Sequence, residues 1–98
     1  MSKQDLQSIM NAVNKENLVQ DVIDMVNIPS ATGSEAEMSV YMERKYLSMG
    51  LEVIKQEVEP GRTNVFGLLR GTGGGPVLQF DGHLDVSFTG TESFMQGG

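Results

Sequence analysis

The sequence predicts an α/β fold in which two N-terminal helices precede a three-stranded partial sheet. Two observations lead to this fold class. Apolar residues recur at helical spacing through the first half of the chain, and the second half holds three runs with strand character. We expect the order helix, helix, strand, strand, strand and tail within one small domain.

The first helical region carries two apolar stripes that differ in phase. The stripes comprise Leu6, Ile9, Met10 and Val13, followed by Leu18, Val19, Val22, Ile23 and Val26. Because the apolar face swings round between them, we expect a break at residues 14–17, with Asn14 as a cap for the part that follows. Pro29 disfavours the α conformation at Ile28, so the helix ends just before that residue.

The second helix has sequence signals at both ends. Ser34 and Glu37 match a Ser-x-x-Glu capping box. At the other end, Gly50 suits the left-handed position after a helix, where Leu51 can cover Tyr46 in a Schellman motif. The predicted inner face consists of Ala36, Val40, Tyr41 and Leu47.

Three stretches with strand character follow. Residues 51–58 are rich in β-branched side chains but charged, which suits an edge strand, and residues 59–62 place Pro and Gly at the centre of a type II turn. Residues 64–70 are almost continuously apolar, as in a strand covered on both faces. After a glycine loop at residues 71–75, residues 77–86 alternate between apolar and polar side chains. The apolar side holds Leu78, Phe80, Leu84 and Val86, and the polar side holds Gln79, Asp81, His83 and Asp85.

Composition excludes several classes of function. The net charge is −6, with seven basic residues, which argues against a nucleic-acid partner. The chain has no cysteine, so disulfides, thiolate metal sites and cysteine nucleophiles are excluded, and a reducing compartment fits. The polar N-terminus lacks the apolar core of a signal peptide, and no run is long enough to span a bilayer. We therefore expect a cytoplasmic protein with no membrane partner.

The chain's single histidine, His83, lies between two carboxylates, Asp81 and Asp85, on the polar face of the third predicted strand. A carboxylate two residues away can accept one ring N–H and leave the other nitrogen free to bind a metal. An isolated His-x-Asp pair is more often a surface histidine with an acidic neighbour. Here the pair ends an apolar strand, where α/β folds place their sites, so we expect a functional pair. Catalytic zinc needs about three protein ligands, and this chain offers one histidine.

The stretch from Phe80 to Val86, Phe-Asp-Gly-His-Leu-Asp-Val, resembles the first metal-binding motif of the M20 family. This family comprises zinc-dependent peptidases and deacylases of the acetylornithine deacetylase, succinyl-diaminopimelate desuccinylase, carboxypeptidase G and aminoacylase group. Three upstream segments are similar to the family in the same order: an Ile-Pro-Ser turn between two helices at residues 26–35, a step into the first strand at residues 49–53, and an asparagine strand with a glycine turn at residues 64–73. The resemblance implies an incomplete zinc-exopeptidase-like catalytic domain.

By this resemblance, His83 is a ligand to one of two zinc (or cobalt) ions, and Asp85 is the catalytic-site carboxylate that orients it. The family reaction is hydrolysis of an amide bond next to a carboxylate-bearing group, with a small acylated amino acid or peptide as substrate. Ser87 departs from the family, which usually has proline there, and the family's other ligands and general base lie downstream. We expect residues 1–88 to be the N-terminal portion of such a catalytic domain, residues 89–98 a flexible tail, and the chain alone to be inactive.

Two alternatives remain open. The chain could be a non-catalytic truncated or regulatory fragment that binds a partner, or another copy of itself, through an open sheet edge. A plain helix–sheet domain without a site is the weaker alternative. Since the apolar strands at residues 64–70 and 77–86 would lack cover in a fragment, we expect a homo-oligomer formed through an exposed strand edge.

Overall fold

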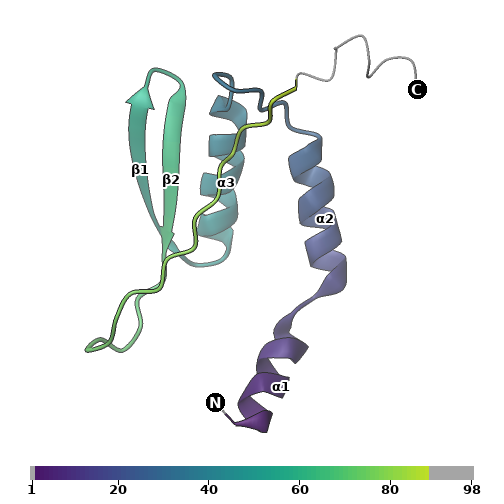
Figure 1. Ribbon diagram of the computed structural model, residues 1–98, viewed down its shortest axis with the longest axis vertical. Coiled ribbons are helices and arrows are strands. Elements are labelled where there is room, and N and C mark those ends of the chain that lie inside the picture. Colours follow the sequence, from purple (N-terminus) through teal and green to yellow (C-terminus); the bar gives the residue numbers. More distant parts are fainter. Residues whose placement is uncertain (1, 89–98) are drawn as a thin grey trace.

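The computed structural model describes residues 2–88, which form three helices and a two-stranded antiparallel sheet (Figure 1). In chain order the elements are α1 (Lys3–Ala12), α2 (Lys15–Val26), α3 (Ala36–Ser48), β1 (Glu52–Glu59) and β2 (Arg62–Leu68). The protein is thus a small α/β fold, but the prediction of two helices followed by a three-stranded sheet is wrong. The predicted flexible tail at residues 89–98 lies outside the described residues.

The first helical region is broken as predicted, with Asn14 as the cap, but the break lies at residues 13–14 and residues 15–17 already belong to α2. Asn14 is the N-cap of α2, and its side-chain oxygen accepts a hydrogen bond from the backbone N–H of Asn17 at 2.9 Å. This bond satisfies one of the amide groups that the start of a helix leaves without a partner. The helix before the break, α1, begins with a capping box in which the side chains of Ser2 and Asp5 bond each other's backbone N–H groups.

The predicted end of α3 is also confirmed. Gly50 has a φ of 80°, a left-handed conformation that glycine adopts at little cost. Its backbone N–H donates to the carbonyl of Leu47 at 3.0 Å, and that of Leu51 donates to the carbonyl of Tyr46 at 3.0 Å. These are the two hydrogen bonds of a Schellman motif, and they turn the chain directly into β1.

The start of α3 differs from the prediction. The N-cap is Glu35, whose side chain makes no capping hydrogen bond, so the capping box at Ser34 and Glu37 is wrong. Ser34 instead donates its backbone N–H to the carbonyl of Ala31 at 2.7 Å. It therefore belongs to the turn that precedes the helix.

The buried face of α3 packs against β2. Met38 and Ser39 are only 4% and 5% exposed, and the Ser39 hydroxyl donates to the carbonyl of Thr63 at 3.0 Å. Two residues of the predicted inner face, Val40 and Leu47, are 46% and 57% exposed. The helix is therefore turned about its axis relative to the prediction, with Met38 and Ser39 on its buried face.

The two strands form a hairpin in which Ile54 pairs with Phe66 and Glu59 pairs with Arg62. Gly61 has a φ of 78°, the left-handed conformation that the predicted turn requires. α3 covers one face of this hairpin (Figure 1). The prediction that the second strand is covered on both faces is wrong, since Phe66 remains 44% exposed.

Residues 77–86 do not form the predicted third strand. Their one backbone pairing within the described range is an isolated parallel bridge between Val86 and Ala31. A strand is held by hydrogen bonds to a neighbour along its length, and the first part of this stretch has no such neighbour. Its apolar side chains are therefore largely exposed: Val77 at 87%, Leu78 at 80% and Phe80 at 89%.

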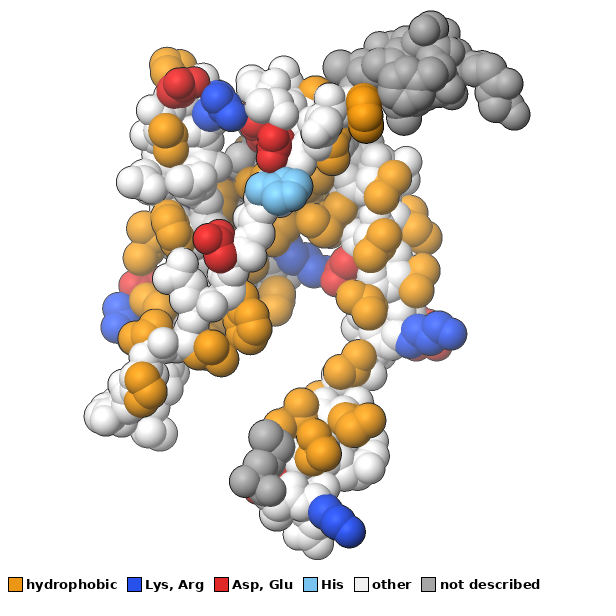
Figure 2. Space-filling view, in the orientation of Figure 1, with side chains coloured by type: hydrophobic (Ala, Val, Ile, Leu, Met, Phe, Trp, Pro, Cys, Tyr) orange, Lys and Arg blue, Asp and Glu red, His pale blue; other side chains and the backbone are white. Residues whose placement is uncertain are grey.

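The chain is extended for its length. Its radius of gyration is 17.0 Å, whereas a compact domain of this size has about 13 Å. Figure 1 shows α1 standing away from the hairpin, and neither α1 nor α2 holds a buried residue. Apolar side chains line both helices at the surface (Figure 2). Within the described part of the chain, none of the helices combines the length and hydropathy that a membrane span requires.

Candidate functional site

The loop between α2 and α3 meets the segment that carries His83. The backbone N–H of Val86 donates to the carbonyl of Ser30 at 2.9 Å, and that of Thr32 donates to the carbonyl of Val86 at 3.1 Å. Ser30 is only 4% exposed, so the pairing is anchored in a packed part of the fold. These bonds bring Thr32 beside Asp85, which lies 53 positions later in the sequence.

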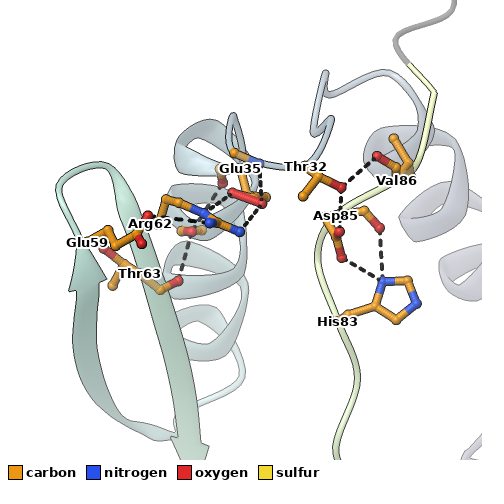
Figure 3. Close-up of polar contacts among 10 residues, drawn as sticks. Thr32, Glu35, Glu59, Arg62, Thr63, His83, Asp85 and Val86 are labelled. Carbon is orange, nitrogen blue, oxygen red and sulfur yellow. Dashed lines mark hydrogen bonds and ion pairs between the residues drawn. The ribbon is translucent and has the colours of Figure 1, made fainter.

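Thr32, Asp85 and His83 form a chain of polar contacts (Figure 3). The Thr32 hydroxyl donates to Oδ2 of Asp85 at 2.7 Å. Nδ1 of His83 lies 3.1 Å from Oδ1 of Asp85 and 2.9 Å from the backbone carbonyl oxygen of the same residue. Both neighbours are acceptors, so we assign the ring proton to Nδ1. The predicted contact between His83 and Asp85 is present, whereas the roles assigned to the two residues stay predictions.

The other ring nitrogen of His83, Nε2, is on the edge of the ring that faces away from Asp85 (Figure 3). The His83 side chain is 85% exposed. With the proton on Nδ1, Nε2 carries a lone pair that can accept a hydrogen bond or bind a metal ion. The geometry therefore presents one oriented nitrogen donor to the solvent.

The Asp85 carboxylate is kept ionised by its neighbours. The Thr32 hydroxyl is the main reason that the pKa of Asp85 lies below its ordinary value. The backbone N–H of Asp85 and the His83 ring act in the same direction, while partial burial opposes them. An ionised carboxylate only accepts hydrogen bonds, which suits it to receive the Nδ1 proton of the histidine.

The described residues supply one part of a metal site. Among residues 2–88, no group of three or more His, Asp or Glu side chains could hold a metal ion. Asp81, predicted on the same face as His83, is exposed and makes no recorded hydrogen bond or ion pair within that range. One imidazole whose second N–H is held by an oxygen acceptor fits a single ligand position, because metal-binding histidines commonly have such a partner. It does not fit a complete zinc site, which takes two or more further protein ligands.

A second polar cluster, which the sequence did not predict, joins the same loop to the hairpin (Figure 3). The Glu35 side chain is only 9% exposed. Its Oε1 accepts the backbone N–H of Gly33 at 2.7 Å, and the Arg62 guanidinium reaches both carboxylate oxygens, at 3.1 and 3.2 Å. Arg62 also contacts Glu59 at 3.4 Å. The cluster fixes the loop that carries Thr32. No local sequence pattern predicts this cluster, because Glu35 and Arg62 are 27 positions apart.

We expect Glu35 to stabilise the fold at neutral pH and to lose that effect in acid. The Gly33 N–H, followed by Arg62, holds the pKa of Glu35 below its ordinary value. Because the folded-state pKa is the lower one, the stabilisation is complete above the ordinary value of about 4.3 and disappears as the pH falls through the folded-state value. Urea unfolding of the unmodified chain and of Glu35→Gln, from about pH 7 to about pH 3, measures this effect. The difference in unfolding free energy should shrink with acidity, and a difference that stays constant would contradict the ion pair.

Comparison with known proteins gives a distant relative. The chain is 28% identical over 82 residues to the uncharacterized protein YqjE of Bacillus subtilis (strain 168), an alignment that covers 80% of this chain. The chain spans 22% of the length of that protein. No protein-family model matches the chain, and no solved structure matches it significantly. The comparisons therefore establish no family and assign no function.

Proposed function

We propose that the chain is the first part of the catalytic domain of a metal-dependent amidohydrolase or exopeptidase of the M20 type. The observation that carries this proposal is the geometry of His83 and Asp85. The carboxylate lies 3.1 Å from Nδ1, which leaves Nε2 as the free donor of an exposed ring. This is the arrangement in which a histidine serves as a metal ligand with its second nitrogen held by the protein. The ordered motifs between residues 26 and 73 support the same lineage.

In this proposal His83 binds zinc (or cobalt) through Nε2, and Asp85 orients the ring. The metal would polarise the amide carbonyl and make water nucleophilic at neutral pH. The other ligands and the general base come from outside the described residues, so we assign hydrolysis to the whole protein and none to this chain alone. The substrate class is a small acylated amino acid or peptide with a carboxylate beside the amide that is cleaved.

The exposed apolar surface supports a place within a larger protein. Leu69, Leu78 and Phe80 are each 79% or more exposed, although such side chains normally lie inside a fold. The relative from Bacillus subtilis is several times longer than the matched region. We place the protein in the cytoplasm, which the absence of cysteine supports.

A zinc titration of the chain by calorimetry tests the proposal. We expect weak binding that His83→Gln abolishes, because the described residues provide a single ligand. Binding that is unchanged in His83→Gln would contradict the proposed role of the histidine. The reading frame beyond residue 98 offers an independent check, since the M20 resemblance implies an aspartate, then two adjacent glutamates, then a histidine.

A second candidate function is self-association through an open strand edge. The hairpin supports this candidate, because each of its two strands has one edge without a strand partner within residues 2–88. The exposed apolar side chains at residues 77–80, which follow β2 in the sequence, add to this support. Exposed strand edges with apolar side chains readily pair with another chain. We propose that the partner is a second copy of this chain, which would give a homo-oligomer.

Light scattering tests this second candidate. We expect a mass above that of the 10.7 kDa monomer at high concentration. Ile54→Lys on β1 should shift the protein towards monomer, because this side chain is 50% exposed on a strand of the hairpin and a lysine on an edge strand opposes strand pairing. Ile9→Lys on α1 is the matched control, since it changes an equally apolar exposed residue away from the edge. A monomeric mass for the unmodified chain would exclude self-association.

A further inference from the structure

The two oxygens of the Asp85 carboxylate have different partners. Oδ2 accepts the Thr32 hydroxyl at 2.7 Å, and Oδ1 lies 3.1 Å from Nδ1 of His83. A carboxylate held at one oxygen can turn only a little about its last bond, so the first contact sets the direction of the second. The hydrogen bond from Thr32 thus sets the orientation of the Asp85 carboxylate relative to the His83 ring.

Thr32 is itself held in place by the backbone. Its N–H donates to the carbonyl of Val86 at 3.1 Å, which ties the loop to the residue directly after Asp85. Its hydroxyl also lies 3.4 Å from the same carbonyl oxygen. The hydroxyl has one proton, and the shorter contact to a charged acceptor is the stronger one. The hydroxyl proton therefore goes to Asp85.

We propose that Thr32 is a positioning residue, which orients the Asp85 carboxylate so that His83 keeps its proton on Nδ1 and offers Nε2 as a ligand. This inference rests on the proposed function, because it explains how a ligand nitrogen is prepared. It adds Thr32 to the pair of His83 and Asp85 that the sequence predicted. The alternative is that Thr32 only ties the loop to residues 85–86, with no effect on the ring.

The ring tautomer separates these two roles. A merely structural tie leaves the tautomer unchanged, since Nδ1 keeps both of its acceptors, the Asp85 carboxylate at 3.1 Å and the Asp85 backbone carbonyl at 2.9 Å. A positioning role changes the tautomer ratio, because a turned carboxylate leaves Nδ1 with the backbone carbonyl as its one remaining acceptor of the two. His83 is the single histidine of the chain, so nitrogen-15 labelling of histidine gives the signals of one ring.

The experiment records long-range proton–nitrogen spectra at about pH 9, where a histidine ring is neutral. The variants are Thr32→Val, which replaces the hydroxyl with a methyl group, Thr32→Ser, which keeps it, and Asp85→Ala, which removes the carboxylate. We expect Thr32→Val to raise the ratio of the Nε2–H to the Nδ1–H tautomer about three- to tenfold, as loss of one hydrogen bond predicts. Thr32→Ser should match the unmodified chain, and Asp85→Ala should show at least the change of Thr32→Val.

Three results would overturn the inference. They are an unchanged ratio in Thr32→Val, a Thr32→Ser ratio that follows the valine variant, and an Asp85→Ala ratio equal to that of the unmodified chain. If Thr32→Val does not fold, Thr32→Ala, which also removes the hydroxyl, decides instead: a raised ratio of the Nε2–H to the Nδ1–H tautomer supports the inference, and an unchanged ratio contradicts it. The spectra use no metal, so a failed zinc titration would remove the proposed function and leave this result standing.

Discussion

Replacing Asp85 with alanine is expected to weaken zinc binding at His83 by about 10- to 100-fold. The carboxylate holds Nδ1 at 3.1 Å, and without it only the backbone carbonyl at 2.9 Å remains as an acceptor. The ring can then turn, and its proton can move to the nitrogen that would bind the metal. A zinc titration followed on the His83 ring signals measures the change, since these signals report weak binding directly.

Asp81→Ala is the matched control for this substitution. It removes the same charge at the same distance along the sequence from His83, but Asp81 has no recorded contact with the ring within residues 2–88. We expect its zinc affinity to equal that of the unmodified chain. Equal losses in the two variants would show that the effect comes from net charge and not from the contact with Asp85.

Gly67→Ala is expected to lower the free energy of unfolding by about 1–2 kcal/mol. A Cβ atom at this position of β2 would lie 2.9 Å from Cγ of Tyr46 and 2.9 Å from Cδ1 of Leu51. Such overpacking destabilises the folded state by about 1–3 kcal/mol, whereas replacing a glycine in a strand stabilises it by only about 0.5–1 kcal/mol. The steric cost is the larger effect. Urea unfolding at neutral pH measures the difference.

Gly71→Ala provides the comparison for Gly67→Ala. No atom lies within 4 Å of a Cβ built at Gly71, and its φ is outside the left-handed region. We expect its stability to equal or slightly exceed that of the unmodified chain. If Gly67→Ala were equally stable, Tyr46 and Leu51 could not lie against β2, and the packing of the end of α3 on the hairpin would be wrong.

Local signals in the sequence were enough to predict the ends of several elements. The break at Asn14 and the Schellman motif at Gly50 each depend on residues within five positions of one another. Hydrogen bonds of this range form between neighbours along the chain, so the sequence alone specifies them. The contact between His83 and Asp85 belongs to the same class, with a separation of two residues.

Features that depend on distant partners could not be predicted in this way. The stretch at residues 77–80 has strand periodicity, but a strand also needs a neighbour to pair with, and the described residues give it none. The start of α3 lies one residue later than predicted, at the N-cap Glu35, whose side chain bonds Arg62 and the backbone N–H of Gly33 and does not cap the helix. The side-chain contact of Thr32 with Asp85 likewise requires the fold, since 53 positions separate them.

Metal coordination by Nε2 of His83 is tested most directly by nitrogen-15 spectra of this single ring, recorded with and without zinc. We predict that the Nε2 signal moves on addition of zinc while Nδ1 keeps its proton. A zinc-dependent change at Nδ1 with the proton on Nε2, or no change at either nitrogen, would contradict the role of His83 as a metal ligand.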